Sequence, residues 1–242
     1  MNSNLENLIN TSNLLVLIPA FNESLNIETV LNELATYKYN VLVINDGSSD
    51  DTYSKARGCG VPVLDLPYNL GVGGALRAGF QYAVRNGFEA IVQIDADGQH
   101  PIGHIEDLIR ATNDTDAHLV LGSRFLGPSL SMELGMIRRS TMKVLARSAS
   151  KATGTRITDS TSGFRLIRNP LLEKFSKNFA SNYLGDTYEA LIAAGRSGYR
   201  VHEIPAPITD RLNGVSSSSS LKSIVQTLKV LTVALLKLHT KI

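Results

Sequence analysis

Short, mostly apolar runs alternate with amphipathic stretches along most of this chain. Continuous apolar runs are typical of strands in a parallel sheet that is covered on both faces, and apolar residues at helical spacing lie between them. The runs predict strands at residues 14–18, 41–44, 61–66, 91–94, 119–122, 163–167 and 199–204. Helices are predicted at residues 24–35, 50–58, 71–85, 102–112, 132–152 and 186–194. This order predicts an α/β fold with a mostly parallel sheet and helices on both faces.

The same pattern predicts one domain between two short ends. Residues 1–13 are polar and are expected to be a flexible N-terminus, residues 14–215 form the domain, and residues 216–242 hold a serine run and a terminal helix. In that helix the lysines lie close to one stripe and the leucines lie elsewhere. An amphipathic helix on an anionic membrane fits this pattern, and docking on a partner or packing against its own domain are the alternatives.

Charge and cysteine content exclude several classes of protein. The chain has 242 residues and a formal net charge of +2, and its cations are scattered rather than interleaved with aromatic residues, so nucleic-acid binding is not expected. Cys59 is the only cysteine, which excludes an intrachain disulfide and a cysteine-rich metal site. The first residues lack the basic and apolar regions of a secretory signal. We therefore expect a cytoplasmic protein.

Acidic residues follow three of the predicted strands. Asp95 and Asp97 come after the fourth strand, Asp46 after the second and Glu23 after the first. The carboxyl ends of parallel strands meet at one edge of a sheet, where ligands bind in open α/β folds. Two carboxylates with one residue between them suit a hard divalent cation, although a strand-end acid that caps the next helix has the same appearance.

A glycine-rich segment, GVGG at residues 71–74, lies between the second and the fourth of these strands. Its glycines open a helix, so backbone N–H groups and a positive dipole end are available to an anion. Arg77 follows in that helix and is either a phosphate ligand or a solvated surface charge. An edge of carboxylates repels an anion unless a divalent cation intervenes, so the pattern favours a metal-bridged diphosphate of a nucleotide sugar.

Five motifs in this order resemble those of the family 2 glycosyltransferases. They are LIPAFNE at 17–23, NDGSSD at 45–50, NLG at 69–71, DADGQH at 95–100 and GSR at 122–124. Within that family the chain is most similar to the branch of dolichyl-phosphate mannose synthases and bacterial polyprenyl-phosphate glycosyltransferases. The resemblance implies a GT-A fold and a metal-dependent, inverting transfer from a nucleoside-diphosphate sugar to a lipid-linked acceptor.

The resemblance also implies roles for single residues. Those implied in nucleotide-sugar binding are Pro19, Ala20, Asn22, Glu23, Asp46, Gly71, Arg77, Asp95, Ala96 and Gln99. Those implied as ligands of Mg²⁺ or Mn²⁺ are Asp95, Asp97 and Gln99, which makes Asp97 a catalytic residue as well. Those implied in binding the acceptor or its phosphate are Arg124, Arg165 and Arg211.

Two further segments resemble the same branch. TDSTSGFR at 158–165 resembles its acceptor-side motif, and EIP at 203–205 with RLNGVS at 211–216 resembles its closing segment. If the acceptor is a saccharide hydroxyl, a carboxylate must remove its proton, and the candidates in order are Asp159, Glu189 and Asp186. A lipid phosphate is already ionised at neutral pH, so the arginines then matter more than a base. The sequence leaves both acceptors open.

Two positions depart from the family pattern. Asn45 stands where the family usually has an acid, and Ser216 is followed by a serine run where a lysine often stands. The first departure bears on how the base is gripped, and the second on a contact to the lipid phosphate. No pair of long apolar spans follows the domain. We therefore expect peripheral contact with the cytoplasmic membrane face through the terminal helix, and a homodimer stays open.

Three other functions were weighed against this one. A phosphatase of the haloacid dehalogenase type also has a strand that ends in Asp-x-Asp-Gly, but near its N-terminus and followed by Thr or Val. A nicotinamide dehydrogenase needs its glycine motif directly after the first strand, which is not the case here. A nucleotide-sugar-binding protein without activity is disfavoured because Asp46, Asp95 and Asp97 are all present.

Overall fold

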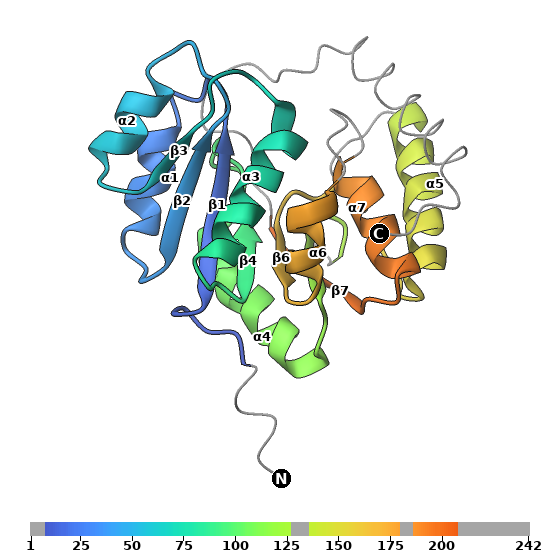
Figure 1. Cartoon of the computed structure of the whole chain (residues 1–242). Coiled ribbons are helices and arrows are strands. Elements are labelled where there is room, and N and C mark those ends of the chain that lie inside the picture. Colours follow the sequence, from blue (N-terminus) through green and yellow to red (C-terminus); the bar gives the residue numbers. More distant parts are fainter. Residues whose placement is uncertain (1–7, 127–135, 180–185, 208–242) are drawn as a thin grey trace.

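The computed structural model describes residues 8–126, 136–179 and 186–207, and its centre is a mixed β-sheet. Its strands lie in the order β3-β2-β1-β4-β6-β5-β7 (Figure 1). They are β1 (Leu14–Ala20), β2 (Asn40–Asn45), β3 (Val63–Asp65), β4 (Ala90–Gln93), β5 (Leu119–Ser123), β6 (Arg165–Arg168) and β7 (Val201–Pro205). All neighbours pair in parallel except β6, which runs antiparallel to β4 and β5. The predicted mostly parallel sheet is confirmed.

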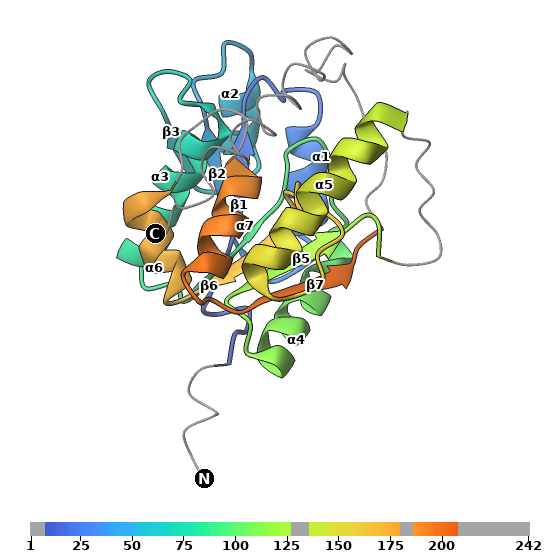
Figure 2. The ribbon, with the colours of Figure 1, turned by 90° about the vertical axis from the view of Figure 1, so that its right-hand side faces the viewer.

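Helices cover both faces of this sheet. They are α1 (Ile27–Leu34), α2 (Thr52–Gly58), α3 (Gly71–Arg85), α4 (Ile105–Thr115), α5 (Met136–Thr153), α6 (Leu171–Asn178) and α7 (Asp186–Arg196), and a short 3-10 helix, η1 (Ile102–His104), leads into α4. One buried cluster joins α1, α2 and α4 to one face, and a second joins α3, α5, α6 and α7 to the other. Figure 2 shows α5 and α7 side by side on the second face.

The central strand β1 explains why the sequence shows continuous apolar runs. Leu15 and Leu17 belong to the cluster that contains α3, whereas Leu14, Val16 and Ile18 belong to the cluster that contains α1. Successive side chains of a strand point to opposite faces, and here both faces are covered. Every position from Leu14 to Ile18 is therefore buried, and no polar residue alternates with the apolar ones.

The strand β1 continues through Pro19, where the sequence predicts its end. The Leu17 carbonyl accepts the Ile94 N–H at 3.1 Å, so the backbone of Leu17 faces β4. Pro19, two residues further along, faces the same side, but β4 has already ended at Gln93. The missing N–H of Pro19 therefore leaves no ladder hydrogen bond unfilled.

The start of the first helix differs from the prediction. The helix α1 begins at Ile27 after Asn26, and Ser24 is not its N-cap. The Ser24 N–H is instead bonded to Asp50 Oδ2 at 3.1 Å, in the neighbouring loop. The residues that α1 buries are Ile27, Val30, Leu31 and Leu34, at helical spacing.

The helix α6 was not predicted from the sequence. It has only eight residues, and short amphipathic segments give a weak periodic signal. Its buried residues Leu171, Leu172 and Phe175 follow Pro170 at helical spacing. That pattern was the available signal.

Most of the two predicted ends of the chain, residues 1–13 and 216–242, lies outside the described residues. Residues 8–13 are described, and Ile9 among them is buried and bonded to Asn113. The serine run and the predicted amphipathic helix fall within residues 208–242, which are not described. The division of the chain at residues 14 and 215 therefore stays a prediction. Within the described ranges, no helix has both the length and the apolar content that crossing a bilayer requires.

The close contact between α5 and α7 depends on Gly195, and a substitution at this position tests it. A Cβ atom at Gly195 would lie 2.7 Å from the Ala152 carbonyl oxygen, which is backbone and cannot move aside easily. We expect Gly195→Ala to lower the free energy of unfolding by about 1–3 kcal/mol, as overpacking typically does. Urea denaturation followed by circular dichroism measures this change.

Gly58→Ala is the matched control, because a Cβ atom at this helical position meets nothing within 4 Å. Its stability should be unchanged or slightly higher, since alanine restricts the unfolded chain. Equal losses in both variants would contradict the close contact at Gly195.

Candidate functional site

One edge of the sheet collects the residues that the sequence singles out. Because β1, β2, β4, β5 and β7 run in the same direction, their carboxyl ends meet at this edge, and the antiparallel β6 begins there. Pro19 and Ala20 end β1, Asp46 follows β2, Asp95 follows β4 and Arg124 follows β5. Ligands of open α/β sheets bind at such an edge.

The loops after β1 and β2 are tied together by hydrogen bonds between side chains and backbone. Asn22 adopts a left-handed backbone conformation with φ of 55°, and its Oδ1 accepts the Ser49 N–H at 2.9 Å. The Glu23 N–H donates to Thr52 Oγ1 at 2.8 Å. The Asn22 side chain therefore holds the two loops in place on the predicted nucleotide side.

Asp46 connects the end of β2 to the start of α3. Its side chain is buried, and Oδ1 accepts the Leu70 N–H at 2.7 Å. A Cβ atom at Gly47 would lie 2.6 Å from the Asn69 nitrogen, so the two loops are in close contact. Burial raises the pKa of Asp46, although the N–H groups of Leu70 and Gly71 act in the opposite direction. The structure thus brings Asp46 and Gly71 together, as the sequence predicts.

A cross-strand neighbour explains the amide at position 45. Asn45 and Asp65 are partners in the register of β2 and β3, and Asn45 Nδ2 donates to Asp65 Oδ1 at 2.6 Å. An acid at position 45 would face the carboxylate of Asp65, and like charges directly opposite each other destabilise a sheet. The pairing of β2 with β3 therefore explains why an amide, and not an acid, stands at position 45.

Asp95 and Asp97 lie in the turn after β4. The Asp95 N–H donates to His100 Nδ1 at 2.9 Å, and His100 Nε2 lies 3.6 Å from Asp95 Oδ2. Because Nδ1 accepts a hydrogen bond, the neutral imidazole carries its proton on Nε2, which faces the carboxylate. Asp97 Oδ1 accepts the Gln99 N–H at 3.1 Å. The buried imidazole thus orients the exposed Asp95 carboxylate from behind.

A divalent cation fits the donors at this turn. A Cβ atom at Gly163 would lie 3.2 Å from both carboxylate oxygens of Asp95, so the glycine leaves open the space in front of them. Carboxylate and amide oxygens suit Mg²⁺ and Mn²⁺. The described residues hold no group of three or more acidic, histidine or cysteine side chains that would bind a metal alone. Substrate phosphates and water would therefore complete the coordination.

Arg124 and Asp159 form a bidentate ion pair beside this turn. Arg124 Nε donates to Asp159 Oδ2 at 2.7 Å, and Nη2 donates to Oδ1 at 2.9 Å. The Thr161 hydroxyl and N–H also donate to Oδ1, and the Asp159 side chain has no solvent exposure. Burial alone would lower the pKa of Arg124, but Asp159 and the nearby Asp95 raise it above its usual value. The guanidinium is therefore a fixed cation near Asp95.

Glu203 holds the loop that carries Asp159, and the sequence analysis gave it no role of its own. Its two carboxylate oxygens accept the N–H groups of Thr158 and Asp159 and the Thr158 hydroxyl, at 2.8 to 2.9 Å. Burial raises the pKa of Glu203, and these hydrogen bonds lower it in part. An acid at a buried position of the apolar strand β7 was the signal that could have identified it.

The predicted role of Arg165 in acceptor binding is contradicted by its burial. Its side chain has no exposure, Nε donates to Gln93 Oε1 at 2.8 Å, and the guanidinium lies 5.8 Å from the centre of the Phe179 ring. Gln93 and Arg165 are cross-strand partners of β4 and β6. The arginine thus supports the sheet, because its charge is enclosed and cannot reach a ligand.

The remaining candidates are not brought into this group by the described contacts. Arg77 is exposed on α3, about 9 Å along the helix axis from its first residue at 1.5 Å per residue. Glu189 is half-buried on α7, and Asp186 begins that helix, with its side chain outside the described set. Arg211 also lies outside the described residues. Their roles stay predictions.

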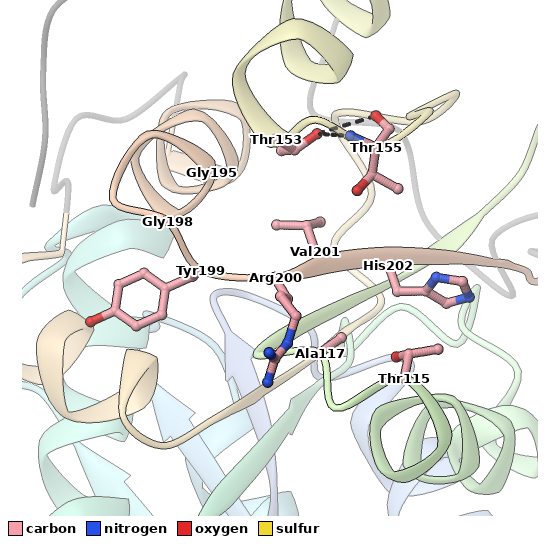
Figure 3. A pocket seen from close by; sticks show the side chains of 10 residues that line it. All are labelled: Thr115, Ala117, Thr153, Thr155, Gly195, Gly198, Tyr199, Arg200, Val201 and His202. Atoms are coloured by element: carbon pink, nitrogen blue, oxygen red, sulfur yellow. Dashed lines mark hydrogen bonds between the residues drawn. The ribbon is translucent and has the colours of Figure 1, made fainter.

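A separate groove lies at the opposite edge of the sheet, where β5 and β7 begin. Figure 3 shows this groove, which has a volume of about 340 Å³, with Thr153, Thr155 and Arg200 among its lining residues. Thr153 Oγ1 accepts the Thr155 N–H at 3.3 Å, and Arg200 is paired with Asp116. These polar groups bond within the protein, so the groove adds no chemistry to the site described above.

Comparison with known proteins identifies the family to which this chain is similar. The model of the family "Glycosyl transferase family 2" matches residues 15–176. A polyprenol monophosphomannose synthase of Mycolicibacterium smegmatis is 31% identical over 220 residues, covering 86% of this chain and 82% of that protein. A UDP-N-acetylglucosamine–dolichyl-phosphate N-acetylglucosaminyltransferase of Methanococcus voltae is 29% identical, covering 78% of this chain and 83% of that protein.

A solved structure shares the fold. The glucosyl-3-phosphoglycerate synthase of Mycobacterium tuberculosis, in complex with Mn²⁺, UDP and phosphoglyceric acid, superposes with a TM-score of 0.68. The match covers 95% of this chain and 79% of the other, at 22% identity. The predicted GT-A fold is confirmed by this likeness and by the family match.

Because the pKa of Asp46 is raised, the melting temperature of an Asp46 variant should depend on pH differently from that of wild type. Because folding favours the protonated carboxyl, the charged Asp46 costs stability once the pH rises through its raised pKa, and costs nothing below the ordinary value of about 3.9. Asp46→Asn keeps an acceptor for the Leu70 N–H without the charge. We expect a higher melting temperature than wild type at about pH 7, with a difference that shrinks towards about pH 4.

Asp114→Asn, at an exposed position of α4, is the control and should show no such pH-dependent gain. A melting temperature of Asp46→Asn below that of wild type at every pH would contradict the cost of burying this charge.

Proposed function

The chain belongs to glycosyltransferase family 2 and is a glycosyltransferase, and from this premise we propose that it transfers a sugar from a nucleoside-diphosphate sugar to a polyprenyl phosphate. The names of two relatives support this acceptor, since one is a synthase of polyprenol monophosphomannose and the other is an N-acetylglucosaminyltransferase whose name includes dolichyl phosphate. Family membership excludes the phosphatase and the dehydrogenase considered from the sequence.

The observation that carries the acceptor class is the ion pair of Arg124 with Asp159. A hydroxyl acceptor needs a free carboxylate as general base, but both oxygens of Asp159 accept hydrogen bonds and the side chain is fully buried. A phosphate acceptor needs a cation and no base. Arg124 donates to Asp159 through Nε and Nη2, so Nη1 is the group that would donate a hydrogen bond to an anionic oxygen of the acceptor.

On the donor side, Asp95, Asp97 and Gln99 would hold a divalent cation, and Mg²⁺ and Mn²⁺ both suit these oxygen donors. When bound, the cation neutralises the diphosphate that leaves with the nucleoside. Asp46 and Glu23, with Pro19 and Ala20 at the end of β1, would bind the base and ribose. The start of α3 at Gly71 offers N–H groups on the same side of the sheet edge.

In the proposed mechanism, the phosphate oxygen of the acceptor attacks the anomeric carbon from the face opposite the leaving diphosphate. Arg124 orients the acceptor phosphate and balances its charge, and Asp159 fixes the direction of the guanidinium. The bond from the sugar to the diphosphate breaks as the new bond forms, so the configuration inverts. No proton has to be removed, because the acceptor is already ionised.

A saccharide hydroxyl is the second acceptor class. Glu189, half-buried on α7, would then be the base in place of Asp159. The two classes differ in pH dependence, since a general base gives the rate an acidic limb and an ionised phosphate does not.

The activity test uses the full chain with a short polyprenyl phosphate, Mn²⁺ or Mg²⁺ and a panel of labelled GDP-mannose, UDP-glucose and UDP-N-acetylglucosamine. We expect label from one of these donors in the lipid phase. Asp97→Asn should lower this transfer at least about 100-fold, because a metal ligand loses its charge, while the melting temperature without ligand stays close to that of wild type. Asp114→Asn is the matched control and should be fully active.

Two results would contradict the proposal. Retention of transfer by Asp97→Asn within about tenfold, or 1.4 kcal/mol in the barrier, would place the metal elsewhere. Thermal stabilisation of wild type by a nucleoside diphosphate and Mn²⁺, without transfer to any acceptor, would instead indicate a binding protein without activity.

We also propose that residues 221–242 bring the enzyme to the membrane surface, on the strength of their sequence pattern. Three lysines near a broad apolar surface should each contribute about 1 kcal/mol of attraction to anionic lipid, and this attraction is screened by salt. We expect the full chain to sediment with vesicles that contain anionic lipid at low salt, and a chain truncated after Ser220 to stay in solution. Equal behaviour of both proteins would contradict the proposal, and a lower melting temperature or a smaller oligomer on truncation would indicate packing within the protein.

A further inference from the structure

Both carboxylate oxygens of Glu203, on β7, accept hydrogen bonds from one short segment of the loop that carries Asp159. Oε1 accepts the N–H groups of Thr158 and Asp159 at 2.9 and 2.8 Å. Oε2 accepts the Thr158 N–H at 2.8 Å and the Thr158 hydroxyl at 2.9 Å. The carboxylate thus fixes both the position and the direction of the backbone at the residue that precedes Asp159.

The held segment is also tied to the end of β5. The Thr158 hydroxyl lies 2.7 Å from Ser123 Oγ, and Ser123 is the residue before Arg124. The Arg124 backbone N–H points at Asp159 Oδ2 at 3.3 Å, and its guanidinium makes the two shorter bonds to the same carboxylate. A continuous chain of hydrogen bonds therefore runs from β7, through the loop, to the cation beside Asp95.

Burial of the charged Glu203 carboxylate has a cost in folding free energy that a neutral side chain at this position would not have. Glu203 is 6% exposed, and within the described residues it makes no ion pair with a lysine, arginine or histidine. A buried carboxylate without a cation is expensive unless hydrogen bonds compensate it. Its hydrogen bonds all lead to the loop that orients Arg124, which points to a function for the carboxylate beyond the stability of β7.

We propose that Glu203 is a positioning residue of the transfer reaction, which sets the direction of the Arg124 guanidinium through Thr158 and Asp159 and so determines how well the acceptor phosphate is bound. This inference rests on the proposed function. Glu203 itself touches neither substrate. Its effect is therefore confined to the acceptor side, because the donor side is held by separate bonds through Asn22 and Asp46.

Glu203→Gln tests this role without changing the size of the side chain. In either orientation of the amide, its NH₂ group would lie less than about 3 Å from the Thr158 N–H, by the distances of both carboxylate oxygens to that nitrogen. Two donors cannot face each other, so the loop has to shift. A displacement of about 1 Å at a binding group can cost 100-fold in rate.

We expect Glu203→Gln to lower kcat/KM for the polyprenyl phosphate by about 10-fold to 100-fold, chiefly through the acceptor KM. The Kd for a nucleoside diphosphate with Mn²⁺, measured by calorimetry, should change less than about twofold, since the donor loops are untouched. Thr158→Val, which removes only the hydroxyl, should give a smaller loss in the same parameter.

A double-mutant cycle distinguishes positioning from a general structural role. In an Arg124→Ala background, Glu203→Gln should lower kcat/KM by less than about a further twofold, because the group that it positions is gone. Thr112→Val, which removes a buried hydrogen bond to the Leu108 carbonyl in α4, is the control. It should lower the melting temperature and leave the acceptor KM and the Kd for the nucleoside diphosphate unchanged.

Additive losses in the cycle, or equal weakening of donor and acceptor binding, would overturn the inference while wild-type transfer to polyprenyl phosphate still supports the proposed function. Absence of transfer by wild type would overturn the proposed function itself. The two failures are therefore distinguishable.

Discussion

The bidentate bond between Arg124 and Asp159 joins the two parts of the chain that form the proposed acceptor side of the site. Asp159 lies in the loop between α5 and β6 and has no solvent exposure, whereas Arg124 directly follows β5 and keeps 22% of its side chain exposed. Separating them would leave a buried carboxylate unpaired, which typically costs about 3–5 kcal/mol. The loop and the strand end therefore stay together, and the cation keeps a fixed direction beside Asp95.

The antiparallel strand β6 makes this junction possible. Lying between β4 and β5, it begins at the edge where its neighbours end. Its leading residues, from Asp159 to Gly163, are therefore delivered between the ends of β4 and β5, and Gly163 lies beside the Asp95 carboxylate, where a Cβ atom would be 3.2 Å from both oxygens. A parallel strand at this place would end at the edge instead, and the chain would reach it only after crossing the sheet.

The site consists of two halves that are held by separate sets of hydrogen bonds. On the proposed donor half, Asn22 and Asp46 tie together the loops around β1, β2 and α3. On the proposed acceptor half, Glu203 and Asp159 hold the loop next to Arg124. Asp95, oriented by His100, lies between them. Under the proposed function, single substitutions should therefore alter donor binding and acceptor binding independently.

The sequence by itself determined the strands, most of the helices and the sheet edge at which the site is proposed. The apolar runs identified every strand of the described sheet, because strands covered on both faces are mostly apolar, and the acids after the strands marked the edge where ligands of such sheets bind. Only the tertiary structure decided that Arg165 is enclosed in the sheet, that Asp159 pairs with Arg124, that Asn45 bonds to Asp65 and that Glu203 holds the loop of Asp159. The physical reason is that periodicity reports burial along one element, whereas the partner of a charged group lies on another element; Arg124 and Asp159 are 35 positions apart, and Thr158 and Glu203 are 45.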